Sequence, residues 1–192
     1  MLKRLWVTGY RSYELNIHGQ TDPRIRVIKD SLRNAIQYYL DDGLEWLITG
    51  GQQGTEQWAA EVGLELKKDY PDLQIAMMFP YSEFGNRWQE NSQERLRLLQ
   101  DQLDFSASVS QEPYKSGYQL SAYGQFMTTH TDGALFLYDT DYPGKSEFDY
   151  NRVRQLPENQ HYSFQTITMD DLEEAARTLA ELETEKNNHF QN

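Results

Sequence analysis

Residues 44–68 combine an apolar run, a cluster of glycines and a helix-like run, in that order, and no other part of the chain constrains the fold so strongly. Residues 44–49 have the composition of a buried strand, and residues 57–68 have the apolar spacing of a helix. Between them, the glycines of Gly50-Gly51-Gln52-Gln53-Gly54 permit positive φ and let a ligand approach the backbone closely. Because a helix N-terminus adds unpaired N–H groups, the segment predicts a strand–turn–helix unit that binds a nucleotide-like anion.

Strand-like and helix-like stretches alternate along the rest of the chain. Apolar runs predict further strands at residues 5–8, 74–79, 105–109, 133–138 and 164–168. The stretches between them carry apolar residues at helical spacing, and a short helix is expected near residues 148–155. This alternation is typical of an α/β, Rossmann-like fold, in which helices cover both faces of a mostly parallel sheet. No low-complexity linker divides the 192 residues, so one domain over residues 1–192 is expected.

Capping residues mark where several of the helices should begin. Asp22 stands before Pro23, and proline is favoured at the first helical position. The spacing of a capping box occurs at Asn91-x-x-Glu94 and at Ser116-x-x-Gln119. The caps expected on these grounds are Asp22, Thr55, Asn91, Ser116 and Asp170.

Charge and composition argue against several classes of protein. A net charge of −12 argues against nonspecific nucleic-acid binding, which depends on neutralising phosphates with Lys and Arg. No run approaches the roughly 20 apolar residues of a membrane span, and the apolar start of the chain ends too early for a signal peptide. A cytoplasmic protein without membrane association is therefore expected. The absence of cysteine excludes disulfides and thiol catalysis, and the acidic run at 170–186 is interpreted as a solvated helix face.

Three loops that follow predicted strands carry groups suited to binding a nucleotide. In open parallel sheets, ligands bind at the carboxyl ends of strands, near the point where the strand order reverses. Thr8-Gly9-Tyr10-Arg11 offers a glycine turn, a hydroxyl and a guanidinium for phosphate. The glycine segment is the second loop. Asp139 in the third loop either meets a sugar hydroxyl or starts a turn, and Lys145 either reaches a phosphate or is solvated.

Glu56 is the residue of the glycine segment with two open interpretations. A carboxylate at a helix start interacts favourably with the helix dipole, and this alone accounts for its position. Alternatively, Glu56 accepts hydrogen bonds from a ribose or acts as a general base. The segment matches neither the dinucleotide fingerprint G-x-G-x-x-G nor the Gly-Lys-[Ser/Thr] ending of a P-loop, so ATP hydrolysis of the P-loop type is not expected.

Aromatic and histidine residues add little further chemistry. Tyr10, Tyr81 and Trp88 lie in or just after strand-end loops, where they are suited to stacking on a base. Trp58 lies on the apolar stripe of its predicted helix and is expected in the core. The histidines lack the spacing of metal ligands, so no metal and no cofactor is identified beyond the suspected nucleotide-like ligand; the histidines are His18, His130, His161 and His189.

Three segments together resemble the YpsA family of Firmicutes. They are Leu5-Trp6-Val7-Thr8-Gly9-Tyr10-Arg11, the run from Gly50 to Glu61, and Asp132-Gly133-Ala134-Leu135-Phe136-Leu137-Tyr138-Asp139. That family belongs to the SLOG group of Rossmann-like proteins, alongside DprA, the LOG phosphoribohydrolases and molybdenum-cofactor carrier-like proteins. The resemblance implies a single SLOG domain that binds a nucleotide or nucleotide derivative, and a link to cell division and growth control.

The glycine segment departs from its counterpart in the LOG enzymes, which carry Pro-Gly-Gly-x-Gly-Thr-x-x-Glu and cleave the base from a nucleoside monophosphate. Here no proline precedes the glycines, and an extra residue separates Gly51 from Gly54. The first glutamate, Glu56, follows Thr55 at once, and Glu61 lies farther along the helix. The position of a catalytic carboxylate therefore stays open between Glu56 and Glu61. Relative to DprA, the chain is acidic and has no evident basic stripe for single-stranded DNA.

The leading hypothesis is a regulatory protein that binds a nucleotide-like ligand. The alternatives are a nucleotide N-glycosidase of the phosphoribohydrolase type, and a protein-interaction module that contacts a cell-division protein. The oligomeric state stays open. The expected ligand-binding residues are Thr8, Gly9, Tyr10, Arg11, Gly50, Gly51, Gln53, Gly54, Thr55, Glu56 and Asp139.

Overall fold

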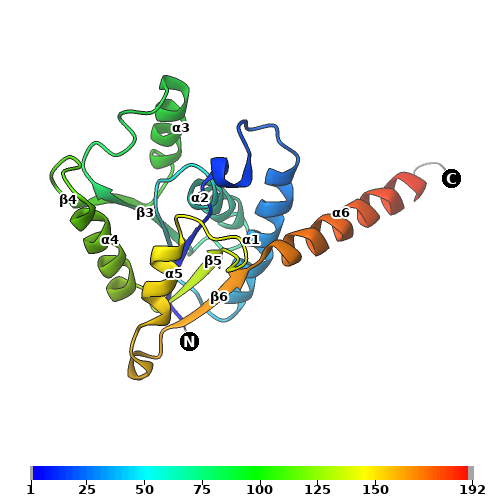
Figure 1. Cartoon of the computed structure of the whole chain (residues 1–192). Coiled ribbons are helices and arrows are strands. Elements are labelled where there is room, and N and C mark those ends of the chain that lie inside the picture. Colours follow the sequence, from blue (N-terminus) through cyan, green and yellow to red (C-terminus); the bar gives the residue numbers. More distant parts are fainter. Residues whose placement is uncertain (1, 190–192) are drawn as a thin grey trace.

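The computed structural model describes residues 2–189 and contains a six-stranded sheet in which all paired neighbours are parallel (Figure 1). The strand order is β4-β3-β2-β1-β5-β6. The strands are β1 (Arg4–Gly9), β2 (Trp46–Thr49), β3 (Gln74–Tyr81), β4 (Phe105–Ser110), β5 (Gly133–Leu137) and β6 (Ser163–Ile167). The predicted Rossmann-like α/β fold is confirmed, including all six strands. Residue 1 and residues 190–192 of the predicted domain lie outside the described range.

Helices cover both faces of the sheet, as predicted. They are α1 (Arg24–Asp41), α2 (Thr55–Leu66), α3 (Glu90–Gln100), α4 (Gly117–His130), α5 (Glu147–Arg154) and α6 (Met169–His189). α1 contacts both α2 and α6, α2 contacts α3, and these helices form one layer. α4 contacts α5, β3 and β4 and belongs to the opposite layer (Figure 1). Short 3-10 helices lie at Ser12–Leu15 and Glu158–Gln160. Within residues 2–189, no helix combines the length and hydropathy needed to cross a membrane.

The core lies where the central strands meet the apolar helix stripes. β5 is buried along its whole length, and β1 is buried from Leu5 onward, because helices cover both faces of these strands. The apolar stripe of α1 is buried as its 3–4 spacing predicts, at Ile25, Ile28, Leu32, Ile36 and Leu40. Trp58 is buried in the core, also as predicted.

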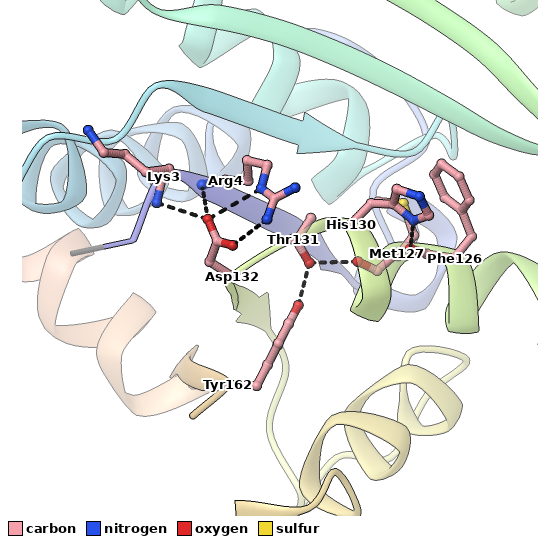
Figure 2. A network of polar contacts seen from close by, with 8 residues as sticks. All are labelled: Lys3, Arg4, Phe126, Met127, His130, Thr131, Asp132 and Tyr162. Carbon is pink, nitrogen blue, oxygen red and sulfur yellow. Dashed lines mark hydrogen bonds and ion pairs between the residues drawn. The ribbon is translucent and has the colours of Figure 1, made fainter. Parts of the chain in front are cut away.

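The edge of the sheet opposite the predicted site is held by polar contacts between β1 and the start of β5 (Figure 2). The Asp132 carboxylate accepts hydrogen bonds from the backbone N–H groups of Lys3 and Arg4, at 3.0 and 2.8 Å. The Arg4 guanidinium also donates to Asp132, at 2.7 Å. These bonds fix the ends of strands that are far apart in sequence, so β1 and β5 keep their register.

The structure corrects four of the expected helix caps. α3 begins at Glu90, so Asn91 lies inside the helix and Gln89 is the N-cap. The N-cap of α2 is Gly54, and the Thr55 hydroxyl donates instead to the Tyr10 carbonyl at 2.8 Å. These two expectations fail because the spacing of residues in the sequence shows neither the tertiary hydrogen bond that a side chain makes instead of capping nor the exact residue at which the helix begins.

The third correction concerns α6, which begins at Met169, so Asp170 is not its cap. The Asp171 N–H donates to the Thr168 hydroxyl at 3.2 Å, and the Asp171 carboxylate accepts the Thr168 N–H at 2.7 Å.

The fourth correction concerns α1, which begins at Arg24 with Pro23 as its N-cap, so Asp22 stands one residue before the cap, although its carboxylate accepts the Arg24 N–H at 3.0 Å. Ser116 is the N-cap of α4 as predicted, and Gln119 accepts the Ser116 N–H at 3.3 Å.

The strand order reverses between β1 and β5, and this places the expected loops at one edge. β1 continues through α1 to β2 on one side, whereas β5, on its other side, continues through α5 to β6. The loops after β1, β2 and β5 therefore converge at the carboxyl edge of the sheet, where Rossmann-like folds bind ligands.

Candidate functional site

A cavity of about 450 Å³ lies at this carboxyl edge. Its walls come from the loop after β1, the glycine turn after β2, the end of β3, the start of α4, and the segment that includes α5. The polar side chains that line it are Arg11, Gln52, Glu56, Ser121, Tyr123, Lys145, Asp149 and Arg152, and the apolar ones are Pro80, Phe84, Leu120 and Phe148. It thus combines a polar floor with an apolar wall, the usual composition of a small-molecule site.

Glu56 lies at the floor of the cavity and is held rigidly. Its side chain is 7% exposed. The Thr8 hydroxyl donates to Glu56 Oε1 at 2.8 Å, and the Gln52 N–H donates to Oε2 at 2.8 Å. Burial raises the pKa of the Glu56 carboxyl, while these two hydrogen bonds and the charge of Arg11 act in the opposite direction. The residue that sequence reasoning singled out is therefore a buried acid at the cavity floor.

Three of the N–H groups around the glycine turn bond within the protein. Gln52 N–H is used by the Glu56 carboxylate, and Thr55 N–H donates to the Tyr10 carbonyl at 3.1 Å. Gln57 N–H approaches the Gln52 carbonyl at 3.4 Å. Gly54 packs against the loop after β1, where a Cβ would lie 2.5 Å from Ser12 N. The Glu56 carboxylate thus takes an N–H group that an external anion would otherwise use.

Asp149 on α5 is a second carboxyl in the same cavity. Burial, together with the negative charge of Glu56, raises its pKa to about 7, against the opposing charges of Arg152 and Arg11. The hydroxyl of Tyr123 on α4 is buried and has no hydrogen-bond partner among the described residues. Burial raises its pKa well above the usual value, with a further contribution from Glu56. The cavity therefore gathers two acids and a phenol with elevated pKa values, a combination frequent at functional sites.

Three cationic side chains also line the cavity, from three separate parts of the chain. Arg11 follows β1, Lys145 precedes α5, and Arg152 lies on α5. None of the three forms an ion pair with another residue in the described part of the chain. Arg152 donates to the Ser121 hydroxyl at 3.1 Å, and its buried Nε has no partner there. These three positive side chains are therefore available to bind an anion.

Among the expected ligand-binding residues, Arg11, Gly51 and Glu56 line the cavity. Thr8 lies directly behind Glu56 as its hydrogen-bond donor. Gly50 separates Glu56 from Tyr123, since a Cβ there would lie 2.3 Å from Glu56 Oε2 and 2.7 Å from the phenol oxygen. The structure thus brings the first two predicted loops together around one carboxylate.

The other expected residues lie outside the cavity lining and have structural contacts. Gly9 packs on β5, with the Leu137 carbonyl 2.4 Å from where a Cβ would stand. The Tyr10 hydroxyl donates to the Tyr142 carbonyl at 2.6 Å and accepts the Asp139 N–H at 2.9 Å. The Asp139 carboxylate accepts the N–H groups of Asp141 and Met169, at 2.9 and 3.1 Å. The remaining members of the set, Gln53, Gly54 and Thr55, form the turn that carries Glu56.

The two carboxylates between which catalysis was left open occupy different places. Glu61 forms ion pairs with Lys29 at 2.6 Å and Arg95 at 2.7 Å, and it does not line the cavity that contains Glu56.

Tyr81 and Trp88, which were expected to stack on a base, contact Phe84 of the apolar wall. Their ring centroids lie 5.5 and 5.3 Å from the centroid of the Phe84 ring. Among the described residues, no three His, Asp or Glu side chains are grouped as metal ligands.

Sequence reasoning missed Tyr123, Asp149 and Arg152. No sequence pattern gives Tyr123 a role, and the short helix expected near residues 148–155, which bears the other two, has no function assigned to it from sequence. The available signal was the run Phe148-Asp149-Tyr150-Asn151-Arg152, in which acid and base are three residues apart and share one helix face. Their convergence with Glu56 depends on the packing of α5 against α4, which local spacing does not reveal.

Fold and site together define a Rossmann-like α/β protein with a charged cavity at the point where its strand order reverses. Comparison with known families makes this more specific. The model of the YpsA family, described as "YspA SLOG family", matches residues 5–172. The chain therefore belongs to the YpsA family, and the predicted resemblance is confirmed.

Curated relatives match the chain over nearly its whole length. A protein named "UPF0398 protein" from Lacticaseibacillus casei (strain BL23) is 55% identical over 190 residues, covering 99% of this chain and 98% of its own. A protein of the same name from Lactiplantibacillus plantarum is 50% identical over 189 residues, covering 98% of each. Another, from Levilactobacillus brevis, is 49% identical over 180 residues and covers 94% and 95%.

Proposed function

We propose that this protein binds a nucleotide-derived anion in the cavity between the glycine turn, α4 and α5. The observation that carries the proposal is the presence in one cavity of cationic side chains free of ion pairs and an apolar wall. In this proposal the protein is a nucleotide-responsive regulator in the cytoplasm, in keeping with the role in growth and division that the family resemblance implies.

The phosphate of the ligand is assigned to Arg11, Lys145 and Arg152. Guanidinium groups bind phosphate through forked, charged hydrogen bonds, and Lys145 adds a flexible point charge. The described structure gives these cations no carboxylate partner within ion-pair distance. This assignment differs from the backbone cradle suggested by the glycine segment, because N–H groups of that turn already have internal partners.

The base of the ligand is assigned to the apolar wall. Phe148 is 78% exposed and Leu120 is 47% exposed, both at the cavity, whereas Phe84 is partly buried among aromatic neighbours. Exposed large apolar side chains beside a charged cavity are typical of a ligand-binding surface. A planar base lying on Phe148 and Leu120 would remove this apolar surface from water, which favours binding.

Calorimetric titration of the purified protein with nucleoside 5′-monophosphates, nucleoside diphosphates and ADP-ribose tests the proposal. We expect saturable binding of at least one of them, weakened about 10- to 100-fold by Arg152→Gln because a charged hydrogen bond is lost. Arg154→Gln is the matched control. Arg154 lies on the same helix but stacks over the Tyr150 ring, 5.6 Å from its centroid. Absence of binding by a well-folded sample across the whole panel would contradict the proposal.

A second candidate function, hydrolysis of an N-glycosidic bond, is favoured by the two carboxyls in the cavity. With its pKa raised to about 7, Asp149 is partly protonated at neutral pH and suited to donate a proton to a departing base. Glu56 as carboxylate would stabilise positive charge at the anomeric carbon or accept a proton from the attacking water. Water adds to that carbon, and the base leaves with the donated proton.

Chromatography of nucleoside monophosphates incubated with the protein separates this candidate from binding alone. Hydrolysis predicts release of free base, lost in Glu56→Gln and strongly reduced in Asp149→Asn. Glu61→Gln is the control, because Glu61 lies in ion pairs away from the cavity. If the protein binds a nucleotide and releases no base from it, the binding role stands and the hydrolytic one is rejected.

A further inference from the structure

Four polar groups at the deep end of the cavity have hydrogen-bonding capacity that the described residues do not use. The Tyr123 hydroxyl and Arg152 Nε are buried and have no partner. Each oxygen of Glu56 accepts one hydrogen bond from the described residues, although a carboxylate offers about four acceptor sites. Asp149 contributes further acceptor sites in the same cavity. Buried polar groups are normally satisfied, so this deficit indicates that a ligand or solvent completes the set.

Tyr123 is the strongest of these indications. Its side chain is only 7% exposed, it lines the cavity, and its hydroxyl lies next to Gly50 at the side occupied by Glu56 Oε2. A phenol that served only to fill the core would be replaced by phenylalanine without loss, because an unpaired buried hydroxyl is destabilising. A ligand that forms a hydrogen bond with the Tyr123 hydroxyl would account for a tyrosine at this position.

Asp149 and Arg152 are positioned together by a small residue on the facing helix. A Cβ on Gly124 of α4 would lie 2.6 Å from Arg152 Nε and 3.0 Å from Asp149 Oδ1. Both groups therefore pack directly on the α4 backbone, at the residue that follows Tyr123 in the sequence. This close contact turns the polar edge of α5 toward Glu56 and Tyr123.

The carboxyl and guanidinium groups at the deep end of the cavity limit the kind of ligand that can bind there. Two carboxyls repel a phosphate, while the guanidinium groups of Arg11 and Arg152 disfavour a metal cation. A neutral group with several adjacent hydroxyls suits both, because hydroxyls donate to carboxylates and accept from Arg and Tyr donors. We propose that the deep end of the cavity is a ribose subsite, in which Glu56 and Asp149 accept hydrogen bonds from the 2′- and 3′-hydroxyls of a ribonucleotide and Tyr123 bonds to the same diol.

This inference rests on the proposed function and specifies its ligand class: ribonucleotides with a free cis-diol, in preference to 2′-deoxy or 2′,3′-substituted nucleotides. It also moves the sugar contact away from Asp139, whose carboxylate bonds to the N–H groups of Asp141 and Met169. The missing hydroxyl of a deoxynucleotide would leave an acceptor site of Glu56 or Asp149 without a donor from the ligand. The expected discrimination is about 10- to 100-fold in Kd, from the loss of a hydrogen bond to a charged group.

Calorimetric titration with matched pairs tests the inference: adenosine 5′-monophosphate against its 2′-deoxy and 3′-deoxy analogues, and ribose 5-phosphate against 2-deoxyribose 5-phosphate. We expect the ribo compound of each pair to bind more tightly by the stated factor. Equal binding of ribo and deoxy compounds would overturn the ribose subsite and leave the proposed function intact. Failure of both members of every pair to bind would overturn the two together.

Variants identify the residues responsible. Tyr123→Phe should leave the melting temperature unchanged or higher, because it removes an unpaired hydroxyl, yet should reduce the ribo-over-deoxy preference about 10-fold. Asp149→Asn should reduce the same preference. Glu61→Gln, outside the cavity on the same helix as Glu56, should leave it unchanged. A Tyr123→Phe protein with full affinity and full preference would remove Tyr123 from the subsite.

Discussion

Glu56 connects the packing of the site to its chemistry. The glycine segment predicts an anion at the start of α2, and the protein supplies one itself, since Glu56 accepts the Gln52 N–H and the Thr8 hydroxyl. The sequence identified this glutamate because it stands beside a glycine turn. It did not reveal the burial that raises the pKa of Glu56, because burial depends on tertiary packing, and the cavity around Glu56 includes Tyr123 and α5 residues that lie far along the chain.

Gly50 is a position at which the site has no room for a side chain. A Cβ there would lie 2.3 Å from Glu56 Oε2 and 2.7 Å from the Tyr123 oxygen. We expect Gly50→Ala to lower the free energy of unfolding by about 1–3 kcal/mol, the usual penalty of overpacking, and to weaken nucleotide binding. Chemical denaturation measures the first effect and calorimetry the second. Gly19→Ala is the control: a Cβ at this residue meets nothing within 4 Å and Gly19 does not line the cavity, so stability should hold or rise and binding should not change.

Asp149 should make the stability of the protein depend on pH. Its pKa is raised from 3.8 to about 7, so between those values the folded protein binds more protons than the unfolded chain. Stability therefore falls as pH rises through this window and levels off above it. The full shift corresponds to about 4 kcal/mol, and because Asp149 is only partly buried, solvent screening reduces the expected total change to about 2 kcal/mol. Asp149→Asn should flatten the profile and raise the melting temperature at pH 8 by about 4–8 °C. An equally steep profile in the variant, or a flattened one in the control Asp141→Asn, would contradict this assignment.

At the scale of elements, strands were predictable and the role of α5 was not. Apolar runs locate strands reliably because each central strand is buried on both faces, as β5 is throughout. Helix starts shifted by one or two residues, as at Thr55 and Asn91, because capping depends on competing tertiary bonds. α5 has only eight residues, and its importance comes from facing α4, a contact between segments that no local pattern reports.

The contact between α4 and α5 can be tested through Gly124. Alanine improves helix propensity at this position, but its Cβ would lie 2.6 Å from Arg152 Nε and 3.0 Å from Asp149 Oδ1. We expect Gly124→Ala to displace α5, to lower nucleotide affinity about 10-fold, and to speed hydrogen exchange at Glu147–Arg154 more than elsewhere. Unchanged affinity with unchanged exchange in α5 would show that this helix does not position the site.

For the whole molecule, the sequence was sufficient for the fold class because the alternation of strands and helices leaves few topologies open. The reversal between β1 and β5 then determines which loops meet, so two of the three predicted loops reach the cavity through Arg11 and Glu56. The third reaches it through Lys145 and α5 instead of Asp139, which bonds to the start of α6. Which residue of a loop faces a ligand depends on side-chain packing, and this could not be predicted.

α6 begins against the body of the protein and ends in a projecting segment, so its two ends should contribute differently to the free energy of unfolding. Figure 1 shows the C-terminal half of this helix extending away from the sheet. Leu172 packs on the core, whereas Leu182 is 48% exposed and Glu183 pairs with Arg26 at the surface. A chain ending at residue 180 loses little buried apolar area, the exposed Arg26–Glu183 ion pair and other contacts at the surface, so its free energy of unfolding should fall by about 1 kcal/mol or less.

The matched control for this truncation is Leu172→Ala in the full chain, which removes packing at the start of the same helix and should lower stability more, by about 1–2 kcal/mol. Thermal unfolding compares the two, and calorimetry with adenosine 5′-monophosphate checks that the truncated protein retains the cavity. Sedimentation of both proteins completes the test. If removal of residues 181–192 changes the number of chains in the particle in solution, or costs more stability than Leu172→Ala, the projecting end of α6 is an interface between copies of the chain.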